Sequence, residues 1–275
     1  MIPEYIQNAK RIVIKIGSAL LFDPVRGEAR KDWMKALAAD VAALHSQGSQ
    51  VLLISSGSIA LGRRHLGLSN KTIRLEEKQA AAATGQVELA QLWSEALADE
   101  GLRAGQILLA PEDTETRRRH INARATIQTL LDLGVVPVVN ENDTVTTYEI
   151  RFGDNDRLAA RVAAMVSADL LILLSDVDGL YTDNPHQTET ARHIPEIRDI
   201  TPEVLAMGGT ANAEFASGGM ATKLAAARIA SAAGVGMIIC KGFDDRPVSA
   251  LNAGAKCSFF RPQTSLVKAR KSWIA

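Results

Sequence analysis

Cysteine and aromatic side chains are both scarce in this chain of 275 residues. Its two cysteines, Cys240 and Cys257, cannot form a disulfide framework, and so few cysteines favour a reducing environment. Aromatic residues make up 4% of the sequence, and 31 Lys+Arg balance 31 Asp+Glu. Without a basic excess or interleaved aromatics, the composition argues against binding to nucleic acid.

Long apolar runs are also absent. No run approaches the roughly 20 residues that a membrane span needs, and the N-terminal segment lacks the apolar region and cleavage site of a signal peptide. The five histidines show no metal-binding spacing. We therefore expect a soluble cytoplasmic protein that contacts neither nucleic acid nor membrane and has no metal site built from its own side chains.

Short apolar segments alternate with longer amphipathic ones along the chain. The apolar segments predict strands at 11–16, 50–54, 104–109, 135–139, 170–175 and 235–240. The amphipathic segments predict helices at 31–46, 75–99, 117–132, 155–167 and 218–233. Strands that are apolar on both faces and alternate with helices are typical of α/β proteins. The expected fold is an open, mostly parallel sheet sandwiched between helices, an αβα arrangement.

Three further segments have a weaker pattern. Residues 141–153 are β-prone and end at a glycine, which predicts a hairpin. Residues 179–217 read as a loop-rich excursion with one short helix after Thr201 and Pro202. A boundary between two lobes is expected near 168–175, although a single sheet could run through both.

Polar residues follow several of the predicted strands, at the edge where open parallel sheets bind ligands. Lys15 lies inside an apolar strand, so its ammonium group must reach water or an ionic partner. Gly17 follows it and allows a tight turn that presents backbone N–H groups to an anion. Taken alone, a lysine whose head reaches solvent is the simpler interpretation.

Two glycine-containing segments open predicted helices. Ser55-Ser56-Gly57-Ser58 follows the second strand and could hold a carboxylate or phosphate, or serve only as a helix cap. Ser217-Gly-Gly-Met-Ala-Thr-Lys223 has the features of a phosphate cradle. Its spacing matches neither the Walker A loop nor the dinucleotide-binding fingerprint, so the segment alone is weak evidence.

Acidic and amide residues are concentrated in two short stretches, Asn140-Glu-Asn-Asp143 and Gly153-Asp-Asn-Asp156. Turn chemistry could explain the first stretch and helix capping part of the second. Neither explains why two such stretches flank one predicted hairpin. Ser175-Asp176 also ends a strand, where turn chemistry is the stronger interpretation.

The combination favours phosphoryl transfer. That chemistry depends on positioning and on stabilising negative charge, which lysines and backbone N–H groups supply. At this level of detail the chain resembles the glutamate 5-kinases of the amino acid kinase superfamily, in order and over nearly its whole length. The matching segments are VIKIGS (13–18), ISSGSIALG (54–62), QAAAATGQ (79–86), NARAT (122–126), VVPVVNEND (135–143), FGDNDRLAA (152–160), LLSDVDGLYTDNP (173–185), SGGMATK (217–223) and RKSW (270–273).

The resemblance implies transfer of a phosphoryl group from ATP, with Mg²⁺, to the side-chain carboxylate of L-glutamate, the first step of proline biosynthesis. It implies that Lys15 and Lys223 stabilise the transferred group and that Asp156 holds them in place. The implied substrate-binding residues are Ser56, Gly57, Asp143 and Asn155. The implied ATP-binding residues are Lys15, Gly17, Ser175, Asp176, Ser217, Gly218, Gly219, Met220, Ala221, Thr222 and Lys223.

Partners and domain organisation are also implied. Proline is expected to inhibit at a site that overlaps the glutamate site, and the hairpin at 144–152 is the expected mobile flap. A homodimer or homotetramer and transient contact with glutamate-5-semialdehyde dehydrogenase are expected. Residues 1–275 would form a single domain, with a glutamate-binding lobe at about 1–168 and a nucleotide-binding lobe at about 169–275. Many family members continue into a PUA domain, which we do not expect in this chain.

The departures from the family pattern are small. Serine stands where threonine is expected at 55, 175 and 217, and residues 240–246 replace a more glycine-rich turn. Two alternatives stay open: a kinase for N-acetylglutamate or aspartate, and a glutamate- or proline-sensing module without catalysis. Asp143 favours a substrate with a free ammonium group, and the two lysines with Asp156 favour catalysis.

Overall fold

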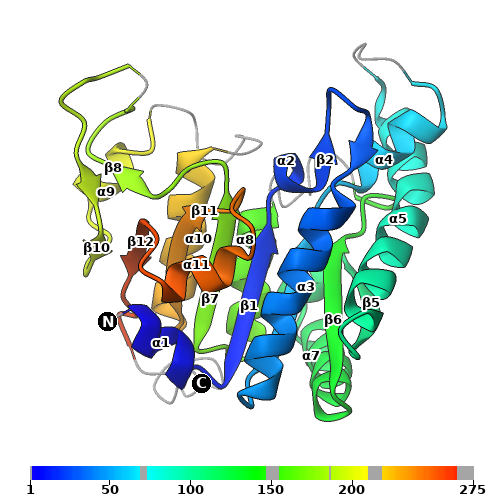
Figure 1. The fold of residues 1–275 in the computed structure, drawn as a ribbon, viewed down its shortest axis with the longest axis horizontal. Helices are drawn as coiled ribbons and strands as arrows, with labels where there is room; N and C mark the ends of the chain where they lie inside the picture. The colour runs from blue at the N-terminus through cyan, green and yellow to red at the C-terminus, as the bar shows by residue number, and fades with distance from the viewer. Residues whose placement is uncertain (1, 69–72, 147–154, 186, 210–218, 265–275) are drawn as a thin grey trace.

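One eight-stranded sheet runs through the molecule in the order β10-β12-β11-β7-β1-β4-β6-β5 (Figure 1). The computed structural model describes residues 2–68, 73–146, 155–185, 187–209 and 219–264. All neighbouring strands are parallel except β11 and β12, which are antiparallel. The predicted fold class is thereby confirmed. The strands are β1 (Arg11–Ile16), β4 (Gln50–Ser55), β5 (Arg103–Leu109), β6 (Val135–Glu141), β7 (Leu170–Ser175), β10 (Glu196–Ile197), β11 (Gly236–Lys241) and β12 (Cys257–Phe260).

Helices cover both faces of the sheet and bury two hydrophobic cores. One core contains buried residues of α1 (Ile2–Asn8), α3 (Lys31–Ser46), α5 (Leu75–Ala98) and α11 (Pro247–Asn252). The other contains buried residues of α7 (Arg117–Asp132), α8 (Asn155–Met165) and α10 (Met220–Ala232). Within β1, Ile12, Ile14 and Ile16 belong to the first core and Val13 to the second. Because side chains alternate along a strand, Lys15 is directed toward the face of α8 and α10.

Shorter elements surround the carboxyl edge of the sheet and the excursion after β7 (Figure 1). They are α2 (Ser18–Leu21), β2 (Phe22–Asp23), β3 (Glu28–Ala29), α4 (Ser58–His65), α6 (Pro111–Glu115), β8 (Leu180–Tyr181), β9 (His193–Ile194) and α9 (Pro202–Ala206). The short helix predicted after Thr201 is confirmed as α9, and the Thr201 side chain caps it by accepting a hydrogen bond from the Val204 N–H. None of the helices that the structure describes is long and apolar enough to cross a membrane.

The predicted strands and helices occur with ends that shift by at most two residues. Two of these shifts have a backbone cause. Gly219 caps α10 with a φ of 102°, so the helix begins at Met220 and not at 218. Ser167 has a φ of 52°, and α8 ends at Met165 where the prediction placed 167. Strand β12 is a further addition to the sheet, beyond the six predicted strands.

The structure differs from the predicted hairpin at its start. Thr144 and Val145 lie in a turn after β6, where a strand was expected. The turn is held by Asn142, whose carbonyl oxygen accepts hydrogen bonds from the Val145 N–H at 3.3 Å and from Thr146 Oγ1 at 2.7 Å. Local bonds of this kind compete with strand pairing. The rest of the predicted hairpin, 147–153, lies outside the described residues.

Candidate active site

Two buried lysines meet one buried aspartate at the carboxyl edge of the sheet. Lys15 Nζ lies 2.5 Å from Asp156 Oδ1, and Lys223 Nζ lies 3.2 Å from Asp156 Oδ2. The Asp156 side chain is 0% exposed and each lysine side chain 8%. The three residues predicted to act together, at the end of β1, the start of α8 and the start of α10, are therefore brought into contact.

The charges of this cluster are set by its burial. Burial alone raises the pKa of the Asp156 carboxyl, but the Lys15 and Lys223 ammonium groups outweigh it and lower the pKa to about 2 from the ordinary 3.8. Thr222 Oγ1 lies 3.3 Å from Asp156 Oδ2 and donates to the Gly219 carbonyl at 2.8 Å. The aspartate is therefore ionised at neutral pH and leaves the cluster with a net positive charge.

Backbone turns surround the lysines. Gly17 follows β1, and a Cβ there would lie 3.3 Å from the Leu174 carbonyl oxygen, which accepts the Gly17 N–H at 3.1 Å. Glycine makes this close approach easy, whereas its φ of −68° is open to any residue. Gly219 does need its left-handed φ, and Met220, Ala221, Thr222 and Lys223 form the first turn of α10. Ser217 and Gly218 lie outside the described residues.

Ser175 and Asp176 lie at the carboxyl end of β7, as predicted. Ser175 is buried, and its hydroxyl donates to Asp176 Oδ1 at 2.9 Å. The Ser175 carbonyl accepts the Gly242 N–H at 2.8 Å, which ties β7 to the turn after β11. This is the turn chemistry that the sequence favoured. Asp176 is exposed at the carboxyl edge of the sheet.

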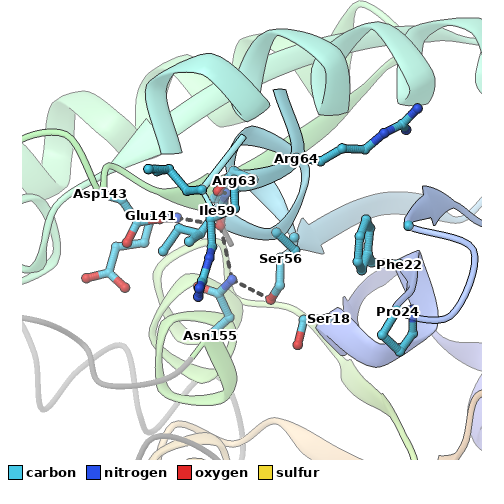
Figure 2. A pocket seen from close by; sticks show the side chains of 16 residues that line it. Ser18, Phe22, Pro24, Ser56, Ile59, Arg63, Arg64, Glu141, Asp143 and Asn155 are labelled. Carbon is cyan, nitrogen blue, oxygen red and sulfur yellow. Dashed lines mark hydrogen bonds between the residues drawn. The ribbon is translucent and has the colours of Figure 1, made fainter. Parts of the chain in front are cut away.

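A cavity of about 590 Å³ lies beside the lysine cluster and is lined by all four predicted substrate-binding residues, Ser56, Gly57, Asp143 and Asn155 (Figure 2). Asn155 Nδ2 donates to Ser56 Oγ at 2.7 Å and to the Ser55 carbonyl at 3.3 Å. Because Asn155 immediately precedes Asp156, α8 supplies one side chain to the cavity and the next to the lysines. The cavity and the cluster are therefore fixed relative to each other.

Asn140 is a site residue that the sequence reasoning passed over. Its Oδ1 accepts from Asn155 Nδ2 at 3.0 Å, and its Nδ2 donates to Gln86 Oε1 at 2.9 Å. Glu141 and Arg63 also line the cavity and were not predicted. The position of Asn140 at the end of a buried strand, three residues before Asp143, was the signal available for it. Arg63 had none, because it belongs to a helix with an ordinary polar face.

Metal ligands do not cluster in the part of the chain that the structure describes, where no group of three or more His, Cys, Asp or Glu side chains could hold an ion.

The fold and the site define a class of protein. A sequence model described as the amino acid kinase family matches residues 10–241. Among solved structures, a carbamate kinase from Giardia lamblia bound to AMP-PNP has a TM-score of 0.65 at 19% identity, over 93% of this chain and 99% of that one. A UMP kinase from Bacillus anthracis has a TM-score of 0.61 at 13% identity, over 93% and 97%.

Curated relatives narrow the class. A glutamate 5-kinase from Gluconobacter oxydans is 56% identical over 267 residues, which cover 97% of this chain and 71% of the relative. Glutamate 5-kinase 1 from Rhizobium meliloti is 57% identical over 270 residues, covering 98% and 68%. The chain belongs to the amino acid kinase family and, within it, to the glutamate 5-kinases.

Proposed function

We propose that the chain transfers the terminal phosphoryl group of ATP to the side-chain carboxylate of L-glutamate, giving γ-glutamyl phosphate, the first step of proline biosynthesis. The observation that carries this proposal is the pair of buried lysines on Asp156, next to a cavity lined with amide and acidic groups. The names of the relatives, all glutamate 5-kinases, support the substrate.

Lys15 and Lys223 would stabilise the transferred group. Phosphoryl transfer spreads negative charge over the phosphoryl oxygens, and fixed positive groups in a buried site lower the energy of that arrangement. Asp156 is a positioning residue, since its ionised carboxylate holds an ammonium group on each of its oxygens. The lysines therefore need no rearrangement when the charge develops.

The cavity would bind glutamate at both ends. Asp143 is suited to the α-ammonium group, because a carboxylate offers the strongest hydrogen bonds to that cation. Gly57 caps the eight-residue helix α4 with a φ of 105°, and the N–H groups at this helix start would receive the side-chain carboxylate. Ser56 and Asn155, joined by their 2.7 Å hydrogen bond, would orient the carboxylate toward Lys15.

ATP supplies the phosphoryl group, and Gly17, Ser175, Asp176 and the start of α10 at Gly219 would hold the nucleotide. Backbone N–H groups at glycine turns and helix starts are suited to phosphates. Mg²⁺ commonly takes ligands from substrate phosphates and water with one or two carboxylates. Asp176, an exposed carboxylate at the carboxyl end of β7, would be suited to an ion that arrives with the nucleotide.

We also propose that proline inhibits the enzyme at the glutamate cavity, because proline carries an α-carboxylate and a cationic nitrogen in the same relation as glutamate does.

A homodimer or homotetramer, a cytoplasmic location and transient contact with glutamate-5-semialdehyde dehydrogenase remain proposals from the family resemblance. Acyl phosphates hydrolyse readily, which favours rapid transfer of the product to a second enzyme. Light scattering of the purified chain would measure its oligomeric state.

The test is ATP-dependent phosphorylation of L-glutamate, trapped as the hydroxamate, with aspartate and N-acetylglutamate as competing substrates. Turnover of glutamate above both competitors is expected. Better turnover of N-acetylglutamate would overturn the substrate assignment, and glutamate binding without turnover would indicate a sensor. Asp143→Ala should raise the KM for glutamate yet change the KM for glutarate, which has no ammonium group, only slightly.

A further inference from the structure

We propose that Arg63 binds the α-carboxylate of the amino acid substrate and makes the cavity specific for a free amino acid. This inference rests on the proposed function and adds a specificity-determining residue to it. Arg63 lines the same cavity as Asp143 and Asn155 but lies on helix α4, which follows the carboxyl end of β4.

Helix α4 is held in one rotation by its packing on α5. A Cβ on Gly62 would lie 1.7 Å from the Ala81 carbonyl oxygen, and a Cβ on Gly85 would lie 1.9 Å from the Ser58 carbonyl oxygen. Two backbones that approach so closely leave no room for the helix to turn. The buried side of α4, at Leu61 and Gly62, faces α5, and the side that carries Ile59, Ala60 and Arg63 faces the cavity.

The direction of the Arg63 side chain follows from this rotation. Side chains on a helix lean toward its N-terminus, so Arg63 covers the preceding turn of α4. Figure 2 shows Arg63 extending toward Asn155, whereas Arg64, which also lines the cavity, extends in another direction. Gly57 begins the helix six residues earlier, about 9 Å along the axis at ~1.5 Å per residue. The Arg63 guanidinium group leans back toward the start of α4. It therefore faces the cavity at some distance from the N–H groups that would bind the side-chain carboxylate.

The charges around the cavity match a zwitterion with an extra carboxylate. Asp143 and Glu141 are acidic, Arg63 and Arg64 are basic, and the helix start at Gly57 favours an anion. L-Glutamate carries one ammonium group between two carboxylates. With its side-chain carboxylate at Gly57 and its ammonium group at Asp143, the α-carboxylate is the group left for Arg63. A guanidinium group can bind a carboxylate through two parallel hydrogen bonds, which fixes orientation as well as charge.

The experiment compares two substrates in three proteins. The substrates are L-glutamate and its α-amide, L-isoglutamine, which has the same shape but no α-carboxylate charge. The proteins are the wild type, Arg63→Met and the control Arg103→Met, whose exposed arginine at the start of β5 does not line the cavity. The wild type should prefer glutamate in kcat/KM by about ten- to a hundredfold, the range for a hydrogen bond to a charged partner. Arg63→Met should lose most of this preference through a higher KM for glutamate, and Arg103→Met should retain it.

Several results would overturn the inference. One is an equal loss of kcat/KM for glutamate and isoglutamine in Arg63→Met, since that would indicate a general effect on the site. Another is an unchanged preference. Circular dichroism reports whether the variant folds, and Arg63→Lys, which keeps the charge, should recover part of the preference. If the wild type fails to phosphorylate glutamate, the proposed function fails by itself. Glutamate binding measured by saturation-transfer NMR then still tests the role of Arg63, because weaker binding in Arg63→Met than in Arg103→Met is expected.

Discussion

Asp156 shows how much of the site depends on a single residue. Its carboxylate is fully buried and contacts both ammonium groups, so removing it leaves two buried ammonium groups without a counter-charge, and removing either lysine leaves the carboxylate with one cation in place of two. Breaking a buried ion pair typically costs about 3–5 kcal/mol. The arrangement therefore couples catalysis to stability, and the two effects separate only when kinetics and unfolding are both measured.

The lysines should affect turnover more than glutamate affinity. In Lys15→Ala and in Lys223→Ala we expect kcat to fall by about a hundredfold or more, the typical loss for one electrostatic donor. Their influence on glutamate KM should be smaller, because they act on charge that develops during transfer. Steady-state kinetics by the hydroxamate assay measure both constants. Lys35→Ala, at an exposed ion pair with Asp99, is the control. Near-normal turnover in either variant would contradict the assigned roles.

Acid should reveal the buried aspartate. The folded-state pKa of Asp156 is about 2, below its ordinary 3.8, so its ionised form stabilises the fold above pH 3.8 and that contribution disappears as the pH falls toward 2. The lost contribution is about 2 kcal/mol. Urea unfolding of the wild type and of Asp156→Asn over this pH range should therefore show a steeper decline for the wild type. Parallel curves would mean that the Asp156 carboxylate titrates outside this pH range.

The residues of the candidate active site were only partly predictable from the sequence. Lys15 stood out because a charge in an apolar strand requires a partner, and Asp156 because it lies in one of two stretches of acidic and amide residues. The contact between them was not predictable from spacing, since it joins residues 15 and 156 across the fold. Arg63 was missed because its role depends on the rotation of α4, which is set by glycine contacts to another helix.

At the scale of elements, α4 and α5 form a pair whose spacing positions one wall of the cavity. Gly62→Ala tests this pair. Alanine favours a helix by about 1 kcal/mol over glycine, but here its Cβ would overlap the Ala81 carbonyl oxygen. Overpacking of this kind costs about 1–3 kcal/mol or more. We expect a lower free energy of unfolding in urea, together with a higher glutamate KM.

Ser94→Ala, on the exposed side of α5, is the control for this change and should leave both quantities nearly unaltered. A Gly62→Ala protein as stable as the control would show that the helices separate without cost.

The long helices and strands were predicted well because their periodic patterns are clean. The turn at Thr144 was not, because the hydrogen bonds of Asn142 override the β preference of the residues that follow.

At the scale of the whole molecule, both cysteines report on the integrity of the sheet. Cys240 and Cys257 face each other across β11 and β12, and both are buried. Burial raises the pKa of each thiol, that of Cys257 to about 11. Native protein at pH 7 should therefore react slowly with a chromogenic disulfide reagent and rapidly in denaturant. Fast labelling of the native protein would contradict the buried pairing of these strands.

The order of strands across the sheet was beyond the reach of the sequence. Alternation of strands and helices predicts a parallel sheet, yet it does not say that β7 lies between β1 and β11 or that antiparallel β12 follows them. Those neighbours are chosen by how the helices fill both faces. The ligand-binding edge of the sheet could still be predicted, because parallel strands in any order bring their carboxyl ends to the same side.

The position of Lys223 has a consequence for the order in which the chain is made. Asp156 and Lys15 are synthesised well before Lys223, which lies 67 residues after the aspartate. Until α10 leaves the ribosome, the carboxylate has only one of its two cations, and the core on that face of the sheet lacks one of its helices. Contacts between distant segments form slowly. The site is therefore completed at the end of synthesis, and a nascent chain that stops before α10 is an incompletely neutralised precursor in need of protection from aggregation.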